Sequence, residues 1–357
     1  MIGIIIATGA SVAASLVVVQ VAVLPLLFKY SKSVPRKMVF SNCINCPANL
    51  DYENPASCSV VGGRSFKIQF VSKVDECPIE LGVWHIAPIS MLRDLSPISL
   101  SVFEDRLQRE LTTTKNTVVV YCHGNANHRA SPHRLLMYKV FQQLDFHVIA
   151  FDYRGYGDST RIRPTERGVV EDLYQVYAWL ISTLNKESTP AVLLWGHSLG
   201  TAVIANMSAN LLELCSDGEQ LPPPAAIVLE APFTNLTEEV QRHPFSKFVS
   251  WLPYYKDTFL KPFTNSSEYA FTTDDHLTKV PQLPILILHS KADKIVPYDL
   301  GVKLHSTLAK ARFEMPDAAP LVFHSFDSTL GIGHNSLCVC PLIKNVVSDF
   351  LKTIRKE

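Results

Sequence analysis

The sequence predicts an α/β fold in which a mostly parallel central sheet is covered by helices on both faces. Short runs of large apolar residues recur from residue 117 onward, and each is typical of a strand buried on both faces. Amphipathic segments of helical length separate these runs, and strands that alternate with helices form right-handed βαβ units. One apolar run passes through a Gly-x-Ser-x-Gly turn into an apolar helix within residues 191–207, and this order of strand, sharp turn and helix is the context that a nucleophile elbow requires.

The elements are predicted as follows along the chain. Two antiparallel strands are expected first, at residues 65–73 and 80–88. The buried strands are expected at 117–121, 147–152, 191–195, 225–229, 284–289 and 321–326, and the helices at 131–144, 165–181, 202–207 and 341–352. The run at 117–120 is β-branched throughout, which favours a strand. Pro341 suits the first position of the last helix, because a proline there has no hydrogen bond to lose.

The turn at Gly196, Ser198 and Gly200 is predicted to be a nucleophile elbow. A side chain at either glycine would collide with the tightly folded neighbours of such a turn. The elbow would present the Ser198 hydroxyl at the carboxyl end of the strand and aim the amide of Leu199 at a developing oxyanion. A turn of small residues without chemistry is the alternative interpretation.

A serine nucleophile needs an imidazole base and an acid that orients it, in the chain order Ser, acid, His. Asp293, in a loop just after a predicted strand, is the candidate acid, and Glu230, after the preceding strand, is the second candidate. His334 lies in a Gly-bounded loop between the last strand and the last helix and is the candidate base. The alternatives are less suitable, because His305 falls in mid-helix and His324 inside a strand.

The chemistry of such a triad is acyl transfer, for which the sequence predicts no metal and no cofactor. A strand also ends in a glycine turn at Asn125, which can aim backbone N–H groups into a cavity. The backbone amides of Leu199 and Asn125 are therefore the candidate oxyanion hole.

An insertion at about residues 236–280 separates two predicted strands and is rich in aromatic residues. Its functional interpretation is a lid over the site that shapes a pocket for acyl chains, because the crossover passes the carboxyl ends of the strands. An ordinary surface helix is the alternative. The candidate lid residues are Phe245, Phe248, Trp251, Tyr254 and Tyr255.

Three domains are expected: a transmembrane signal-anchor at 1–28, a juxtamembrane segment at 29–63 and the catalytic domain at 64–357. Residues 2–28 carry no charge, and a helix of that length spans about 40 Å against a hydrocarbon core of about 30 Å. A cleaved signal peptide is the alternative, but no basic region precedes the apolar run. The net charge of zero gives no electrostatic footprint for nucleic acid.

The sequence gives opposing indications of membrane orientation. Lys29, Lys32 and the basic residues after them follow the apolar run, which places the catalytic domain in the cytosol by the positive-inside rule. Sequons at Asn206, Asn235 and Asn265 and eight cysteines favour the lumen, and Asn265 and Asn235 are the candidate glycosylation sites. The N-terminal cysteines Cys43, Cys46, Cys58 and Cys77 include one C-x-x-C pair, and zinc ligation, disulfides and free thiols all remain open.

From about residue 64 to the end, the chain resembles the α/β-hydrolase family, and within it the membrane-anchored lysophosphatidylserine lipases, also called monoacylglycerol lipases of the abhydrolase-domain type. The segments that carry the resemblance are 82–85, 123–125, 151–159, 195–201, 230–235, 243–246 and 286–289. The resemblance implies the triad Ser198, Asp293 and His334, an endoplasmic reticulum enzyme that faces the lumen, and lysophospholipid or monoacylglycerol substrates. The cysteine cluster before residue 64 departs from the family pattern.

Two other functions are compatible with the same residues. One is a thioesterase that removes acyl groups from proteins or from acyl-CoA with the same triad. The other is a hydrolase-like module that binds a partner without catalysis, which the intact triad disfavours. The sequence does not indicate the oligomeric state.

Overall fold

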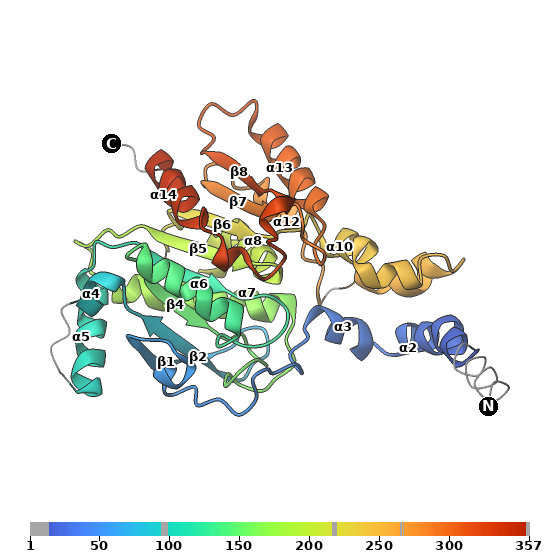
Figure 1. Cartoon of the computed structure of the whole chain (residues 1–357), viewed down its shortest axis with the longest axis horizontal. Helices are drawn as coiled ribbons and strands as arrows, with labels where there is room; N and C mark the ends of the chain where they lie inside the picture. The colour runs from blue at the N-terminus through green and yellow to red at the C-terminus, as the bar shows by residue number, and fades with distance from the viewer. Residues whose placement is uncertain (1–13, 94–98, 216–219, 265, 267, 355–357) are drawn as a thin grey trace.

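The computed structural model describes residues 14–93, 99–215, 220–264, 266 and 268–354. They form an eight-stranded sheet in the order β1-β2-β4-β3-β5-β6-β7-β8 (Figure 1). β1 (Gly63–Val71) and β2 (Pro78–Ile86) form an antiparallel hairpin, and β2 is also antiparallel to β4 (His147–Phe151). The remaining neighbours are parallel: β3 (Val118–Cys122), β5 (Val192–His197), β6 (Ala226–Glu230), β7 (Ile285–Ser290) and β8 (Leu321–Phe326). The predicted, mostly parallel sheet is confirmed.

The sheet is covered on both faces because its central strands are apolar on both sides. In β3, Val118 and Val120 belong to one core, whereas Val119 and Tyr121 belong to the other, as the alternation of side chains along a strand requires. The first core is closed by α7 (Glu166–Thr183), α8 (Leu199–Ala209) and α13 (Tyr298–Arg312). The second is closed by α6 (Pro132–Gln143) and α14 (Ile343–Ile354).

The strand order reverses direction at β3, and this reversal determines where a ligand can bind. β4 lies on one side of β3 and β5 on the other, so the loops after β3 and β5 leave the sheet side by side. In open α/β sheets, the crevice outside the carboxyl ends of the strands at such a switch point is where ligands bind. Asn125 follows β3 and Ser198 follows β5, so both lie at this crevice.

The predicted strands are all present, with ends that differ from the prediction by two residues or fewer. The last helix begins at Ile343 rather than Pro341. α5 (Leu100–Thr113) was not predicted. The short helices α4 (Ile89–Arg93) and α9 (Leu211–Leu214) complete the body of the domain.

The insertion between β6 and β7, here called the lid segment, is a chain of short helices. They are α10 (Leu236–Arg242), η3 (Pro244–Phe248), η4 (Lys256–Leu260), α11 (Lys261–Thr264) and α12 (Thr273–Leu277). From α10 to α11, the lid segment lies beside the N-terminal helices α2 (Leu24–Tyr30) and α3 (Ser33–Val39), at one end of the molecule, whereas α12 packs against α8 and α13 in the body of the domain (Figure 1). The Phe28 and Phe259 rings are 4.8 Å apart, and the Tyr254 hydroxyl donates to the carbonyl of Val21 at 2.6 Å.

In the described part of the chain, we find no helix that would cross a membrane by itself. Two consecutive helical segments, Ala14–Tyr30 and Ser33–Val39, have the necessary length and apolar composition only when taken together, and they are bent by 93°.

Candidate active site

Ser198 stands on a strained turn between β5 and α8, with φ of 53° and ψ of −117°. The turn is tight enough to exclude side chains at both flanking glycines. A Cβ on Gly196 would lie 2.6 Å from the backbone of Gly200, and one on Gly200 would lie 2.1 Å from the carbonyl oxygen of Cys122. The elbow geometry expected from the sequence is therefore present, and Ser198 is half-buried rather than enclosed.

His334 and Asp293 are brought together from loops after β8 and β7. His334 Nδ1 lies 2.7 Å from Asp293 Oδ2, while Asp293 Oδ1 accepts from the amides of Ile295 at 2.8 Å and Val296 at 3.0 Å. Burial raises the pKa of Asp293, but hydrogen bonds from His289 and His334 outweigh it and hold the pKa well below its usual range. Asp293 is thus a carboxylate, and the proton of His334 is on Nδ1, which leaves Nε2 as a base.

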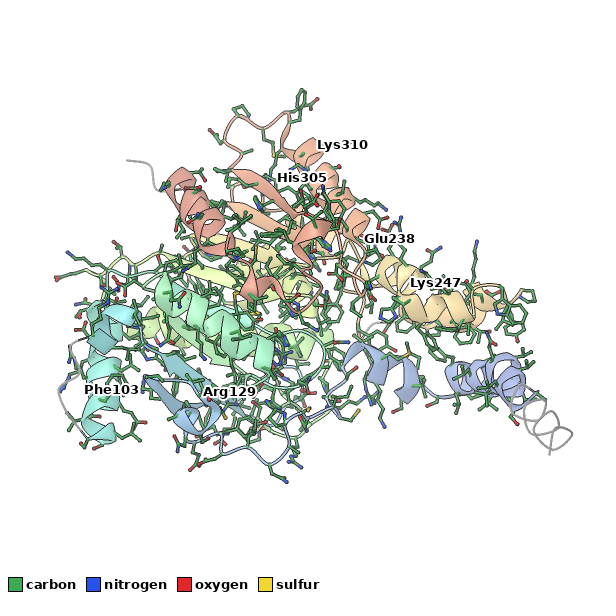
Figure 2. All side chains as sticks on the ribbon, in the orientation of Figure 1. Phe103, Arg129, Glu238, Lys247, His305 and Lys310 are labelled. Atoms are coloured by element: carbon green, nitrogen blue, oxygen red, sulfur yellow. The ribbon has the colours of Figure 1, made fainter. Side chains whose placement is uncertain are left out.

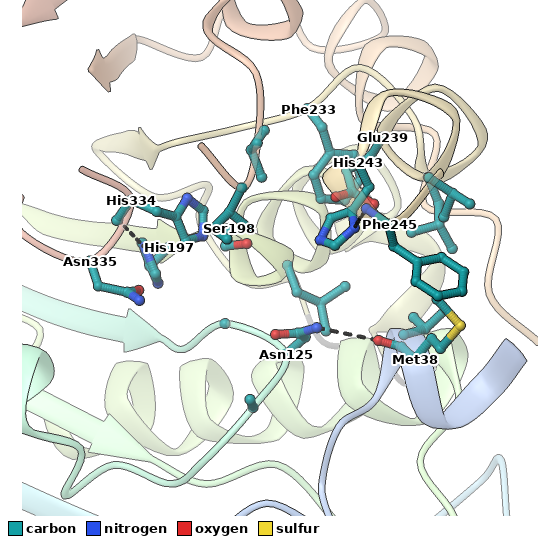
Figure 3. A pocket seen from close by; sticks show the side chains of 18 of the residues that line it. Met38, Asn125, His197, Ser198, Phe233, Glu239, His243, Phe245, His334 and Asn335 are labelled. Atoms are coloured by element: carbon teal, nitrogen blue, oxygen red, sulfur yellow. Dashed lines mark hydrogen bonds between the residues drawn. The ribbon is translucent and has the colours of Figure 1, made fainter. Parts of the chain in front are cut away.

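The loop that carries His334 is held from two sides. The Ser290 hydroxyl donates to the carbonyl of Ile332 at 2.5 Å, and His197 Nε2 donates to the carbonyl of His334 at 3.0 Å (Figure 3). Burial lowers the pKa of His197 well below its usual range, so this ring is a neutral positioning group. Because adjacent side chains diverge at the elbow, the position of His197 directly before Ser198 predicts such a structural role rather than a catalytic one.

The other candidate acid and bases lie elsewhere. Glu230 accepts a hydrogen bond from Trp195 Nε1 at 2.8 Å and makes no contact with His334. Burial raises the pKa of Glu230 to about 7, partly offset by the Trp195 hydrogen bond. His305 lies on α13 against Phe323 (Figure 2), and the His324 ring packs on Phe326.

The candidate oxyanion-hole residues Leu199 and Asn125 both line the cavity that contains Ser198. The turn after β3 runs against the elbow, since a Cβ on Gly124 would lie 3.4 Å from Ser198 Cβ. Asn125 is fixed on both sides: its carbonyl accepts from the Tyr156 hydroxyl at 2.9 Å, and its Nδ2 donates to the carbonyl of Met38 at 3.3 Å (Figure 3).

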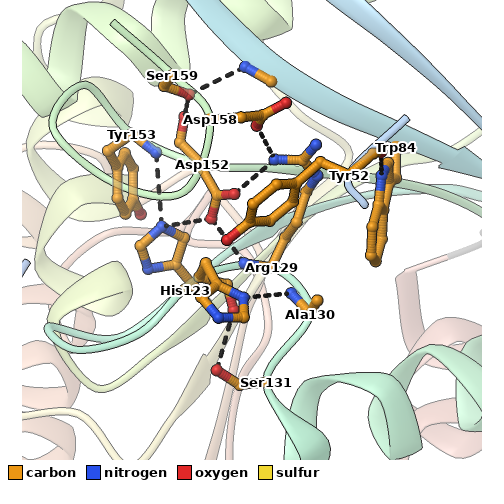
Figure 4. A network of polar contacts seen from close by, with 12 residues as sticks. Tyr52, Trp84, His123, Arg129, Ala130, Ser131, Asp152, Tyr153, Asp158 and Ser159 are labelled. Carbon is orange, nitrogen blue, oxygen red and sulfur yellow. Dashed lines mark hydrogen bonds and ion pairs between the residues drawn. The ribbon is translucent and has the colours of Figure 1, made fainter. Parts of the chain in front are cut away.

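A buried polar network supports this turn from behind (Figure 4). His123 Nδ1 donates to the carbonyl of Gly124 at 2.7 Å, and His123 Nε2 accepts from the amide of Tyr153. Asp152 accepts from both the backbone and the guanidinium of Arg129, each at 2.6 Å. The motif at 151–159 therefore stabilises the loop that holds the candidate oxyanion donor.

Ser198, His334 and the candidate oxyanion donors face one cavity of about 280 Å³. Its other walls include parts of the lid segment, of the N-terminal helix α3, of α6 and of the loop after β7. Among the candidate lid residues, Phe245 lines the cavity, whereas Phe248 and Trp251 are 65% and 62% exposed. Tyr255 is buried against Phe259. The sequence analysis missed Met38 and Val39 of α3 and Glu239 and His243 of the lid segment, all of which line the cavity.

The candidate glycosylation and metal residues are placed as follows. Asn235 caps α10 through a hydrogen bond from the amide of Glu238 at 3.0 Å, and Asn265 lies outside the described residues. All eight cysteines are free: Cys43, Cys46, Cys58, Cys77, Cys122, Cys215, Cys338 and Cys340. Within the described residues, no group of three or more His, Cys, Asp or Glu side chains could hold a metal ion.

Comparisons with known proteins show the family and the fold to which the chain belongs. Residues 117–271 match the α/β-hydrolase fold family. The chain is 34% identical to lysophosphatidylserine lipase ABHD12 of Danio rerio over 92% of this chain and 80% of the relative. It is 36% identical to protein ABHD12B of Homo sapiens, over 76% of this chain and 69% of the relative. The crystal structure of an α/β-hydrolase from Vibrio vulnificus superposes with a TM-score of 0.62 at 15% identity, over 90% and 93% of the two chains.

The fold and the comparisons together define an ester hydrolase of the α/β-hydrolase class. Within that class, the chain belongs to the family of the lysophosphatidylserine lipase ABHD12 proteins.

Proposed function

We propose that the chain cleaves the acyl ester of single-chain glycerolipids, lysophosphatidylserine or monoacylglycerol, through an acyl-enzyme on Ser198. The observation that carries the proposal is the 2.7 Å hydrogen bond between His334 and Asp293 at the cavity that Ser198 also lines. The choice of substrate is supported by the names of the relatives and by the apolar lining from the lid segment and α3.

The steps follow from the positions of the protons. His334 Nε2 removes the Ser198 hydroxyl proton as Oγ attacks the ester carbonyl, and the oxyanion accepts hydrogen bonds from the amides of Leu199 and Asn125. Each such donor contributes about 2.7–4 kcal/mol to the transition state. The bond to the leaving glycerol oxygen then breaks, and His334 gives its proton to that oxygen, which departs as a hydroxyl.

Deacylation repeats the same proton transfers with water as the nucleophile. His334 takes a proton from water as the hydroxide attacks the acyl carbonyl, and returns it to Ser198 as the fatty acid leaves. Asp293 keeps the imidazole in the correct tautomer throughout and stabilises its charged form. No step requires a cofactor.

Replacement of Ser198 by Ala is expected to abolish labelling by a fluorophosphonate probe and to lower kcat by about 10⁶-fold, the size of loss measured for another serine hydrolase. The measurement is turnover of lysophosphatidylserine, monoacylglycerol and a palmitoyl thioester by wild-type and variant membranes. Ser208→Ala on the same helix is the matched control and should behave as wild type. Turnover of the thioester alone would establish the thioesterase function instead. If wild type showed neither labelling nor turnover, the non-catalytic binding module would be the remaining interpretation.

We further propose that residues 1–28 anchor the enzyme in the endoplasmic reticulum membrane, with the catalytic domain in the lumen. Leu16, Val17 and Val18 are exposed and apolar, and the lid segment beside the N-terminal helices exposes Phe248 and Trp251. Lys247 lies on η3 of the lid segment (Figure 2) and directly precedes Phe248 in the sequence. A lipid surface would cover such side chains and leave the lysine at the headgroups. The cytosolic orientation remains the alternative.

The full chain expressed in cells is expected to resist alkaline extraction from membranes and to lose mass on glycosidase treatment. Asn265→Gln should abolish or reduce that shift. Asn206→Gln is the control, because the Asn206 side chain donates to Glu166 at 2.8 Å and is half-buried. Extraction of the chain at alkaline pH would contradict the membrane anchor. The absence of a glycosidase-dependent mass shift in wild type and in both variants would contradict the lumenal orientation.

A further inference from the structure

Two polar side chains of the lid segment face the candidate catalytic residues. Glu239 lies on α10, and His243 is the C-cap residue of the same helix, one turn further along the chain. Both line the cavity with Ser198 and His334, and Figure 3 shows them across the cavity from these two residues. The proposed acyl transfer uses neither of them.

Glu239 and His243 are both available to a ligand. His243 Nδ1 accepts from the amide of Phe245 at 3.2 Å, so its Nε2 carries the hydrogen and is a donor. No described residue makes a hydrogen bond to the Glu239 carboxyl group. Burial raises the pKa of Glu239 to about 8, with a smaller contribution from the negative charge of Asp293. At neutral pH the Glu239 carboxyl group is therefore protonated and offers one donor and one acceptor.

The rest of the cavity wall indicates that the ligand group is uncharged. Burial and the neighbouring His334 lower the pKa of His243, which is therefore neutral as well. Among the described cavity residues, Arg134 is the single lysine or arginine, and its terminal nitrogens donate to the carbonyls of His128 and Ala126, each at 2.6 Å. A phosphate or carboxylate enclosed here would lose its hydration without gaining a free cation.

We propose that Glu239 and His243 bind the free glycerol hydroxyl next to the scissile ester. The inference rests on the proposed function and specifies how a single-chain glycerolipid is selected. A 1-acyl lysophospholipid and a 1-monoacylglycerol both carry this hydroxyl, and a charged headgroup on the third glycerol carbon would stay outside the cavity. A diacyl lipid carries an ester at the second carbon and offers no hydrogen to the pair.

The size of the selection follows from the cost of an unpaired polar group. A substrate without the hydroxyl would cover the half-buried Glu239 and His243 side chains without giving them a partner, which corresponds to roughly 5- to 150-fold in kcat/KM. Sites that bind a substrate hydroxyl reject the analogue lacking it for the same reason.

The test measures kcat/KM for two substrates, the mono-oleoyl ester that glycerol forms at its first carbon and mono-oleoyl propane-1,3-diol, which lacks the hydroxyl at the second carbon. Wild type is expected to prefer the glycerol ester within the range above. Glu239→Leu should reduce that preference to within about 3-fold by lowering turnover of the glycerol ester, whereas Glu239→Gln, which keeps a donor and an acceptor, should retain most of it. Glu238→Leu is the matched control and should retain the preference, because Glu238 bonds to Thr234 and Lys303 and does not line the cavity.

The outcomes separate this inference from the proposed function. Equal turnover of the two esters by wild type, or a preference that survives in Glu239→Leu, would overturn the subsite and leave the esterase. Failure of wild type to hydrolyse either ester would instead contradict the proposed function. Loss of the preference in Glu238→Leu would mean that the helix, rather than the Glu239 side chain, determines it.

Discussion

Replacement of Asp293 by Asn is expected to lower kcat by about 10⁴-fold, as the equivalent change does in a serine protease triad. The amide has nearly the same shape as the carboxylate, so the loop should keep its structure through the hydrogen bonds from Ile295 and Val296. An amide cannot stabilise the imidazolium that forms when His334 accepts the serine proton, and it favours the wrong tautomer. The measurement is kcat for a soluble p-nitrophenyl ester, together with the labelling rate of Ser198.

Glu230→Gln is the matched control, since Glu230 is the other acid at the end of a neighbouring strand. A glutamine oxygen can still accept the hydrogen bond from Trp195 Nε1, which is 2.8 Å from the Glu230 carboxylate. Because Glu230 does not touch His334, we expect its kcat to stay within a few-fold of wild type. A large loss in Glu230→Gln combined with activity in Asp293→Asn would reverse the assignment of the acid.

The choice between these two acids illustrates what a sequence alone can determine. Glu230 and Asp293 each follow a buried strand, and that placement predicts an acid at the correct edge of the sheet for both. The buried strands themselves were predictable, because apolar runs bounded by turns have few other structures available. The geometry that separates the acids depends on which loop reaches the loop of His334, and this contact spans 41 residues.

The lid segment was predictable in position but not in the direction of its side chains. Its aromatic residues indicated a cover over the site, and Phe245 does line the cavity, but Phe248 and Trp251 face outward. The described part of the segment is built from short helices and turns, and because η3 is a 3₁₀-helix and η4 a π-helix, no single periodicity assigns a face. The position of Glu239 in the cavity could not be predicted either, because the orientation of α10 depends on its tertiary packing and not on its own sequence.

The N-terminal segment is more closely integrated into the site than its composition indicated. The segment at 29–63 was expected to be a juxtamembrane segment outside the catalytic domain, yet Met38 and Val39 line the cavity. The carbonyl of Met38 also accepts from the side chain of Asn125, at 3.3 Å. No hydrophobic pattern distinguishes a helix that ends at an active site from one that ends at a membrane.

Replacement of Arg154 by Met is expected to lower the free energy of unfolding by about 3–5 kcal/mol. The guanidinium is fully buried and bonds to Asp172 at 2.7 Å, to Glu171 at 2.7 Å and to Asp75 at 2.5 Å. Methionine fills much of the same volume but leaves the two helix α7 carboxylates buried without a counter-charge. Urea denaturation of the variant and of wild type measures the difference.

The control is Arg163→Met, which removes one partner of the Arg163–Glu268 pair. The side chains of Arg163 and Glu268 are 52% and 37% exposed, so solvent screens their interaction. The loss of unfolding free energy in Arg163→Met should therefore stay below about 1 kcal/mol. The loss of unfolding free energy caused by Arg154→Met, relative to wild type, should also become smaller as the pH is lowered. Burial already raises the pKa of Asp172 to about 6 against the opposing effect of Arg154, and without the arginine the folded state would bind this proton still more tightly than the unfolded state. An equal loss of unfolding free energy in Arg154→Met and Arg163→Met would contradict this explanation. So would a loss in Arg154→Met that increases as the pH is lowered, because Arg154 would then not act by stabilising the buried carboxylates of α7.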